Sequence, residues 1–217
     1  MLKIFDKSLW ANPISLLILM SVAMPVAFNA WSAMLNNFVV EKAAFTGVEI
    51  GILQSLREVP GFLSFTLVFV LLIIKEQTFA VFSLALLGLG VCLTGFFPTV
   101  YGLYFTTILM STGFHYFEAV KQSLSLQWLS QKEAPIILGK LLAIGSLTSL
   151  LVYGCLWVFL EIFELSYYIN FIIGGGVCLT LAFIMFISFP NFPSKVEQNQ
   201  NLVLRKRYWL YYLLTFL

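Results

Sequence analysis

The sequence predicts an all-α integral membrane protein, with six transmembrane helices and the start of a seventh. Of its 217 residues, 60% are hydrophobic and only 10% are charged, whereas a soluble domain carries about 25% charged residues. The apolar residues are gathered into six long runs, and a membrane-spanning helix needs about 20 such residues. The breaks between the runs are short and polar. The net charge of +2 gives no reason to expect a nucleic-acid partner.

Each apolar run is expected to form one helix, and together they define the domain organisation. The six predicted helices cover residues 14–38, 48–74, 79–97, 100–126, 136–160 and 166–189. Residues 1–189 would then be one six-helix bundle, and the polar stretch 190–207 a central loop. Residues 208–217 open with Tyr208 and Trp209, aromatic residues typical of a membrane interface. They predict a seventh helix that is truncated, because ten residues cannot cross a bilayer.

Lysine and arginine in the breaks predict the orientation in the membrane. With the N-terminus in the cytoplasm, the outer loops hold one basic residue, Lys42. The cytoplasmic segments then hold eight: Lys3, Lys7, Lys75, Lys132, Lys195, Arg205, Lys206 and Arg207. Basic residues favour the cytoplasmic side. The first apolar run is too long for a signal-peptide core, so we expect a retained helix. The predicted location is the plasma membrane, the inner membrane of a bacterium.

Polar residues within the predicted helices fall on one face in four of the six, at about 100° per residue. The candidate site residues on these faces are Asn29 in the first helix, Gln54, Arg57 and Glu58 in the second, and His115, Glu118, Lys121 and Gln122 in the fourth. The fifth helix has a weaker polar stripe. The third and sixth contain no charged residue and several glycines, which favour helix packing.

This order, two polar-striped helices followed by a bare one, occurs twice along the chain. It predicts two inverted three-helix repeats, an arrangement found in many secondary transporters. Helices 1, 2, 4 and 5 would surround a polar cavity, and helices 3 and 6 would stand outside it, towards lipid. Pro60 in the second helix removes a backbone hydrogen bond and should bend that helix.

Charged side chains near the middle of the second and fourth helices are expected to pair, because an unpaired charge there costs at least about 2.5 kcal/mol. The simplest pairs are Arg57 with Glu118, or Glu58 with Lys121. We hypothesise that this network binds a substrate or relays a proton. Glu118 or Glu58 would carry the proton, and the imidazole of His115 titrates near neutral pH. The alternative is a set of salt bridges that only holds the helices together.

Two of the amides on these faces leave the same choice open. Asn29 and Gln54 could each hydrogen-bond a solute in the cavity, or make a polar contact between helices.

With six spans, a basic central loop at 190–207 and the onset of a further helix at Tyr208, the chain resembles the N-terminal half of a major facilitator superfamily transporter. The resemblance implies a missing second six-helix half and a central cavity lined by helices 1 and 4. The family's loop motif G-x-x-x-D-R/K-x-G-R/K-R/K is absent, since residues 71–78 are LLIIKEQT. The helix-5 signature G-x-x-x-G-P is also absent. These departures speak against a drug/proton antiporter and leave the substrate class open.

The predicted function is secondary active transport of a small polar or charged solute by alternating access, coupled to an ion, with the proton as first candidate. The expected partners are the lipid bilayer, the solute, protons and the missing half. No cofactor or metal is expected, because the chain has one His, and Cys92, Cys155 and Cys178 lie in apolar runs without CxxC spacing.

Two other functions remain open. The first is a membrane partner protein that does not transport. The second, less favoured, is a membrane-embedded enzyme, for which the H-E-x-x-H and G-x-S-x-G motifs are both absent. We therefore expect no enzyme activity, and no transport by this chain alone.

Overall fold

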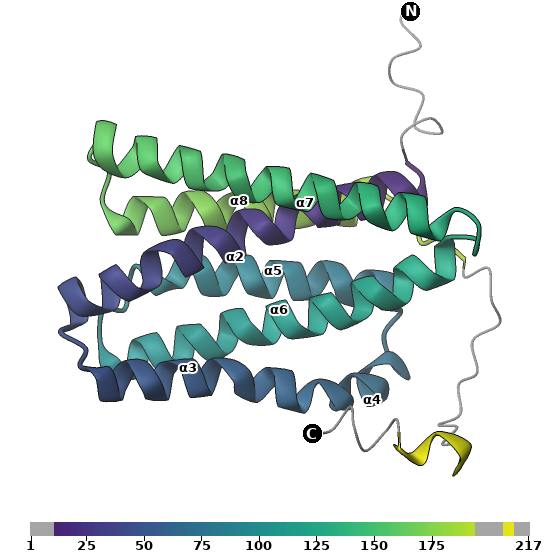
Figure 1. Ribbon diagram of the computed structural model, residues 1–217, viewed down its shortest axis with the longest axis horizontal. Coiled ribbons are helices and arrows are strands. Elements are labelled where there is room, and N and C mark those ends of the chain that lie inside the picture. The colour runs from purple at the N-terminus through teal and green to yellow at the C-terminus, as the bar shows by residue number, and fades with distance from the viewer. Residues whose placement is uncertain (1–10, 194–205, 211–217) are drawn as a thin grey trace, which may run out of the picture.

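The computed structural model describes residues 11–193 and 206–210, and within them the chain is helical and contains no strand (Figure 1). The helices are α2 (Pro13–Ala43), α3 (Gly47–Phe62), η2 (Leu63–Thr66), α4 (Leu67–Leu71), α5 (Glu76–Thr94), α6 (Val100–Trp128), α7 (Ala134–Trp157), η3 (Val158–Ile162), α8 (Tyr167–Ser188) and η4 (Lys206–Tyr208). The predicted all-α fold is confirmed. The predicted start of a seventh helix, at 208–217, lies only in part within the described residues. The basic residues Lys3, Lys7, Lys195 and Arg205 lie outside them.

Four of the described helices are long and apolar enough to cross a membrane, as expected of a membrane protein. They are α2, α5, α7 continued through η3, and α8. Two predicted spans do not meet this measure. The second is divided into α3, η2 and α4, and the fourth, α6, is 29 residues long but carries the polar stripe that lowers its hydropathy. Six membrane crossings therefore stay a prediction.

The short polar breaks fix the helix ends by supplying N-terminal caps. Asn12 accepts a hydrogen bond from a backbone N–H of α2 at 2.9 Å, and Pro13 follows as the first helical residue. Thr46 caps α3 in a capping box, Thr99 caps α6, and Ser166 caps α8. These caps satisfy N–H groups that a helix leaves unpaired at its start. The breaks thus separate the helices although they are only a few residues long.

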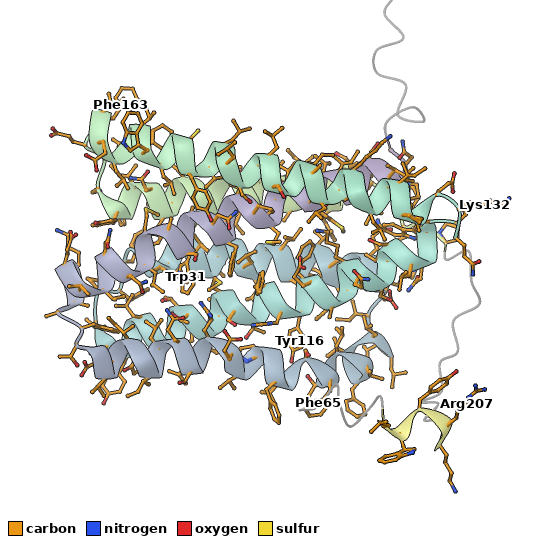
Figure 2. All side chains as sticks on the ribbon, viewed as in Figure 1. Trp31, Phe65, Tyr116, Lys132, Phe163 and Arg207 are labelled. Carbon is orange, nitrogen blue, oxygen red and sulfur yellow. The ribbon has the colours of Figure 1, made fainter. Side chains whose placement is uncertain are left out.

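The second predicted helix changes from an α-helix to a 3-10 helix just after Pro60 and Gly61, and the bend expected at Pro60 stays a prediction. The α-helix ends at Phe62 and continues as the 3-10 helix η2. Tyr116 of α6 supports this interruption, since its hydroxyl lies 2.7 Å from the hydroxyl of Thr66 (Figure 2). The sequence indicated an irregularity at Pro60, but not the contact of η2 with Tyr116.

The main contacts join the helices in the order α3, α6, α5, α8, α2, α7. In Figure 1, α5 lies in the middle of the bundle, while α3 and α7 form its two edges. This order has an internal symmetry. If the first three long helices (α2, α3, α5) are exchanged with the last three (α6, α7, α8), the contact of α3 with α6 becomes that of α7 with α2. The contact of α5 with α6 likewise becomes that of α8 with α2.

Glycines bring α5 against its neighbours at backbone distance. A methyl group on Gly90 would lie 2.5 Å from the backbone nitrogen of Met110 in α6. A methyl group on Gly88 would lie 2.8 Å from the carbonyl oxygen of Gly175 in α8. Of the four helices long and apolar enough to span, α5 is the most buried and α7 with η3 the most exposed. Just over half of α5 is thus buried among helices, while its Phe82 and Leu89 are exposed. That helices 3 and 6 stand towards lipid stays a prediction.

The segment that leaves α8 is fastened to the start of α5 and the end of α6. The buried side chain of Gln77 donates to the carbonyl of Pro190 and accepts from the N–H of Phe192, both at 2.9 Å. The ring of Phe192 lies edge-on to Trp128, with centroids 5.7 Å apart. We call residues 189–192 the α8 exit segment.

Candidate functional site

Two polar pockets lie one helical turn apart along α2 and α6. The first, the Glu118 pocket, has a volume of about 430 Å³ and is lined by α2, α6 and α7. The second, the His115 pocket, has a volume of about 140 Å³ and is lined by α2, α3 and α6. Neither pocket receives a residue from α5 or α8. The helices that line them are the first, second, fourth and fifth of the sequence, the four with polar faces.

The Glu118 pocket holds two opposite charges. The ammonium nitrogen of Lys121 lies 4.0 Å from Oε1 of Glu118, one turn earlier on α6. Their side chains are 20% and 44% exposed, so the carboxylate is the more open of the two. Gln122 lines the same pocket. From α2, Ser21 lines it too, with a hydroxyl that is buried and has no hydrogen-bond partner among the described residues.

The His115 pocket holds a charged cluster of α3 and α6. The guanidinium of Arg57 donates two hydrogen bonds to Oε1 of Glu58, from Nε at 2.9 Å and from Nη2 at 2.7 Å. The other carboxylate oxygen of Glu58 lies 3.8 Å from Nε2 of His115. Among the described residues, this is the ion pair that joins two helices, and it forms when the imidazole is protonated.

The backbone of α3 approaches the imidazole directly. A methyl group on Gly61 would lie 2.8 Å from Cε1 of His115, so a larger residue here would require the imidazole to shift. One turn earlier on α6, Ser111 donates a hydrogen bond to the carbonyl oxygen of Arg57. The α3–α6 contact is thus built around the charged cluster.

The predicted charge pairs are wrong. Arg57 pairs with Glu58, its neighbour in the chain, and Lys121 pairs with Glu118 on its own helix. Helical periodicity shows which side chains share a face, but it does not fix the register of one helix against another. Glu118 and Lys121 are three residues apart, a spacing that places side chains side by side on a helix, so this pair forms within α6.

Of the amides Asn29 and Gln54, the first bridges two helices and the second stands apart from both pockets. Asn29 donates from Nδ2 to the hydroxyl of Ser149 at 2.7 Å, which links α2 to α7 at the wall of the Glu118 pocket. Gln54 lines neither pocket, and its buried Oε1 has no hydrogen-bond partner among the described residues. For Asn29 the geometry agrees with the helix-contact alternative, and a role in binding solute stays a prediction for both.

Sequence reasoning missed the aromatic side of the site. Phe28 of α2 and Phe114 of α6 stack with ring centroids 4.3 Å apart, and Phe114 meets the His115 ring edge-on at 5.0 Å. No pattern distinguishes these two rings from the many other apolar residues of their helices. Gly61 was visible on the polar face of its helix, and its closeness to His115 required the register between α3 and α6.

No protein-family model matches the chain, and a search among curated proteins finds no match. Across residues 11–193 and 206–210, no group of three or more His, Cys, Asp and Glu side chains is placed to hold a metal ion. The function is therefore argued from the two pockets and from the helices that form them.

Proposed function

We propose that the chain is the N-terminal half of a secondary active transporter of the major facilitator type, which moves a small polar or charged solute by alternating access with proton coupling. One observation supports this most directly: the side chains of Glu58 and Glu118, which fall near the middle of the predicted spans 48–74 and 100–126, are 59% and 44% exposed. A carboxylate that faces lipid at this depth costs at least about 2.5 kcal/mol. In a membrane, this face must therefore meet water or another protein.

The contact symmetry of the helices supports the same proposal. Exchange of the first and last three long helices preserves the main contacts, as two three-helix repeats of opposite topology require. The two polar pockets are lined by α3, α6, α2 and α7, the two helices at each end of this contact order. A second six-helix half would cover this face and enclose a cavity. Six crossings, a cytoplasmic N-terminus and a location in the bacterial inner membrane belong to the proposal.

Two features of the site suit a proton-coupled cycle. The Glu118 carboxylate can exchange a proton with water in the pocket, and its charge governs the pairing with Lys121. The His115–Glu58 contact joins α3 to α6, so protonation of the imidazole would strengthen the hold between these helices. Protonation of Glu118 and of His115 would thus change the charge of two side chains that lie one turn apart on α6.

A membrane partner protein that does not transport is the second candidate, because an exposed polar face can also dock another protein. Water access separates the two. The free cysteines Cys92, Cys155 and Cys178 would be replaced by serine, and Gln122→Cys introduced in the Glu118 pocket. A membrane-impermeant maleimide should label this thiol in native membranes. Absence of labelling would favour a docked partner over a cavity.

Phe183→Cys is the matched control for this labelling. Its side chain is 63% exposed on α8, outside the Glu118 pocket, and a thiol there should face lipid and stay unlabelled.

Transport itself is tested in proteoliposomes that contain both halves of the protein. Glu118→Gln should abolish the dependence of uptake on a proton gradient. Unchanged coupling together with unchanged affinity would remove Glu118 from the mechanism. The 217-residue chain alone should give no uptake above that of empty liposomes, because alternating access needs the second bundle.

A further inference from the structure

We propose that the Glu118 pocket binds a small zwitterion, an α-amino acid with an apolar side chain. The inference rests on the proposed transport function and specifies its substrate class. Its starting point is the pair of opposite charges in the pocket, the Lys121 ammonium and the Glu118 carboxylate, 4.0 Å apart.

This ion pair leaves most of its hydrogen-bonding capacity unused. At 4.0 Å the two groups are too far apart for a direct hydrogen bond. An ammonium has three donors and a carboxylate about four acceptor sites. A ligand with a carboxylate and an ammonium on one carbon can place the first against Lys121 and the second against Glu118. The four charges then alternate in sign, and each protein group gains a partner without losing the other.

A singly charged solute fits this site less well. An organic anion would meet Lys121 but would also lie close to the Glu118 carboxylate, and an organic cation would face the reverse. In a partly buried pocket such repulsion is poorly screened. The His115 pocket does not offer the same arrangement, because the Arg57 guanidinium is already held by two hydrogen bonds to Glu58 and the volume is only about 140 Å³.

The remaining lining divides into a polar and an apolar part. On the polar side, the hydroxyl of Ser21 is buried, with the side chain 1% exposed, and has no partner among the described residues. On the α7 side, Leu138, Leu141 and Leu142 line the pocket. Ser146 and Ser149 of α7 line the pocket as well. An apolar amino-acid side chain would be buried against the three leucines, where a sugar hydroxyl would find no partner.

Four probes test this assignment by binding to the purified protein, measured by isothermal titration calorimetry. L-leucine carries both charges, 4-methylpentanoate is the same skeleton without the ammonium, 3-methylbutylamine is the skeleton without the carboxylate, and D-glucose is an uncharged polyol. L-leucine should bind saturably. Each of the other three should bind at least about tenfold more weakly, which corresponds to about 1.4 kcal/mol of binding free energy.

Two variants make the test independent of general defects in folding. Glu118→Gln should narrow or reverse the preference for L-leucine over 4-methylpentanoate, because the ammonium has lost its partner. Lys121→Gln should do the same for L-leucine over 3-methylbutylamine. Lys132→Gln, outside the pocket, is the matched control and should leave both ratios unchanged.

The outcomes separate this inference from the proposed function. Failure of L-leucine to bind, or equal binding of 4-methylpentanoate, overturns the zwitterion assignment. Tight binding of D-glucose overturns it as well but leaves the transport proposal standing. If none of the probes binds and Gln122→Cys also resists the water-soluble maleimide, both proposals fail together.

Discussion

Replacement of Gly113 by alanine tests the packing on which the whole bundle depends. A methyl group at this position of α6 would lie 2.6 Å from the carbonyl oxygen of Ser83 and 2.8 Å from Cα of Leu87, and it would press on the backbone nitrogen of Leu87 as well. All three atoms belong to the α5 backbone, so no side chain can rotate away. The two helices must separate instead. Overpacking of this kind costs about 1–3 kcal/mol, and the backbone contacts place Gly113→Ala at the upper end.

Alanine also has a higher helix propensity than glycine, which opposes this cost. A second glycine-to-alanine variant with the same gain serves as the control. Glycine to alanine within a helix contributes about 0.5–1 kcal/mol of stability. Gly139→Ala in α7 has the same propensity gain, and nothing lies within 4 Å of its new methyl group. The difference in free energy of unfolding between the two variants should therefore be about 2–3 kcal/mol, measured by titration with sodium dodecyl sulfate in mixed micelles. Equal stabilities would refute the close approach of α5 and α6.

Three further predictions concern polar contacts outside the charged clusters. Gln77→Ala should lower the free energy of unfolding by about 1–3 kcal/mol, since two hydrogen bonds to the α8 exit segment are lost, and should speed proteolysis after α8. A double-mutant cycle of Asn29→Ala and Ser149→Ala should give a coupling energy of about 0.6 kcal/mol, typical of interhelical bonds in membranes, and no coupling would mean that α2 and α7 are not joined there. Tyr116→Phe should cost about 0.5–1.5 kcal/mol through its bond to Thr66, whereas Tyr101→Phe, a residue 86% exposed, should cost nothing.

The positions of the helices could be predicted because apolar runs and polar breaks are local properties of the chain. Each predicted span contains a helix, with ends displaced by a few residues to the capping positions. A bend was expected at Pro60, because proline lacks the donor that a continuous helix needs, but the division of this span into α3, η2 and α4 was not. Local patterns do not distinguish an apolar helix that faces lipid from one that is enclosed by other helices. For this reason the sequence did not show that just over half of α5 would be buried among other helices.

The polar faces of the site were predictable, and the partners across them were not. The four polar-striped helices do line the two pockets. To predict which charges pair, one must know the relative height and rotation of two helices. A shift of a few ångströms decides whether Arg57 meets Glu58 or Glu118. Nothing in one sequence fixes these quantities. They depend on contacts such as Gly61 against His115, where the absence of a side chain sets the distance.

The contact order of the helices has a consequence for how the chain is made. α5 and α6 follow one another in the sequence and pack together, so this pair can assemble as soon as it is synthesised. α2, by contrast, is the first of these helices to emerge from the ribosome, and its main partners α7 and α8 are the last. Until then, the Asn29 amide lacks its partner, the hydroxyl of Ser149. The first helix must therefore wait in the bilayer or beside the insertion machinery, and ribosomes that stall before residue 134 would expose it to quality control.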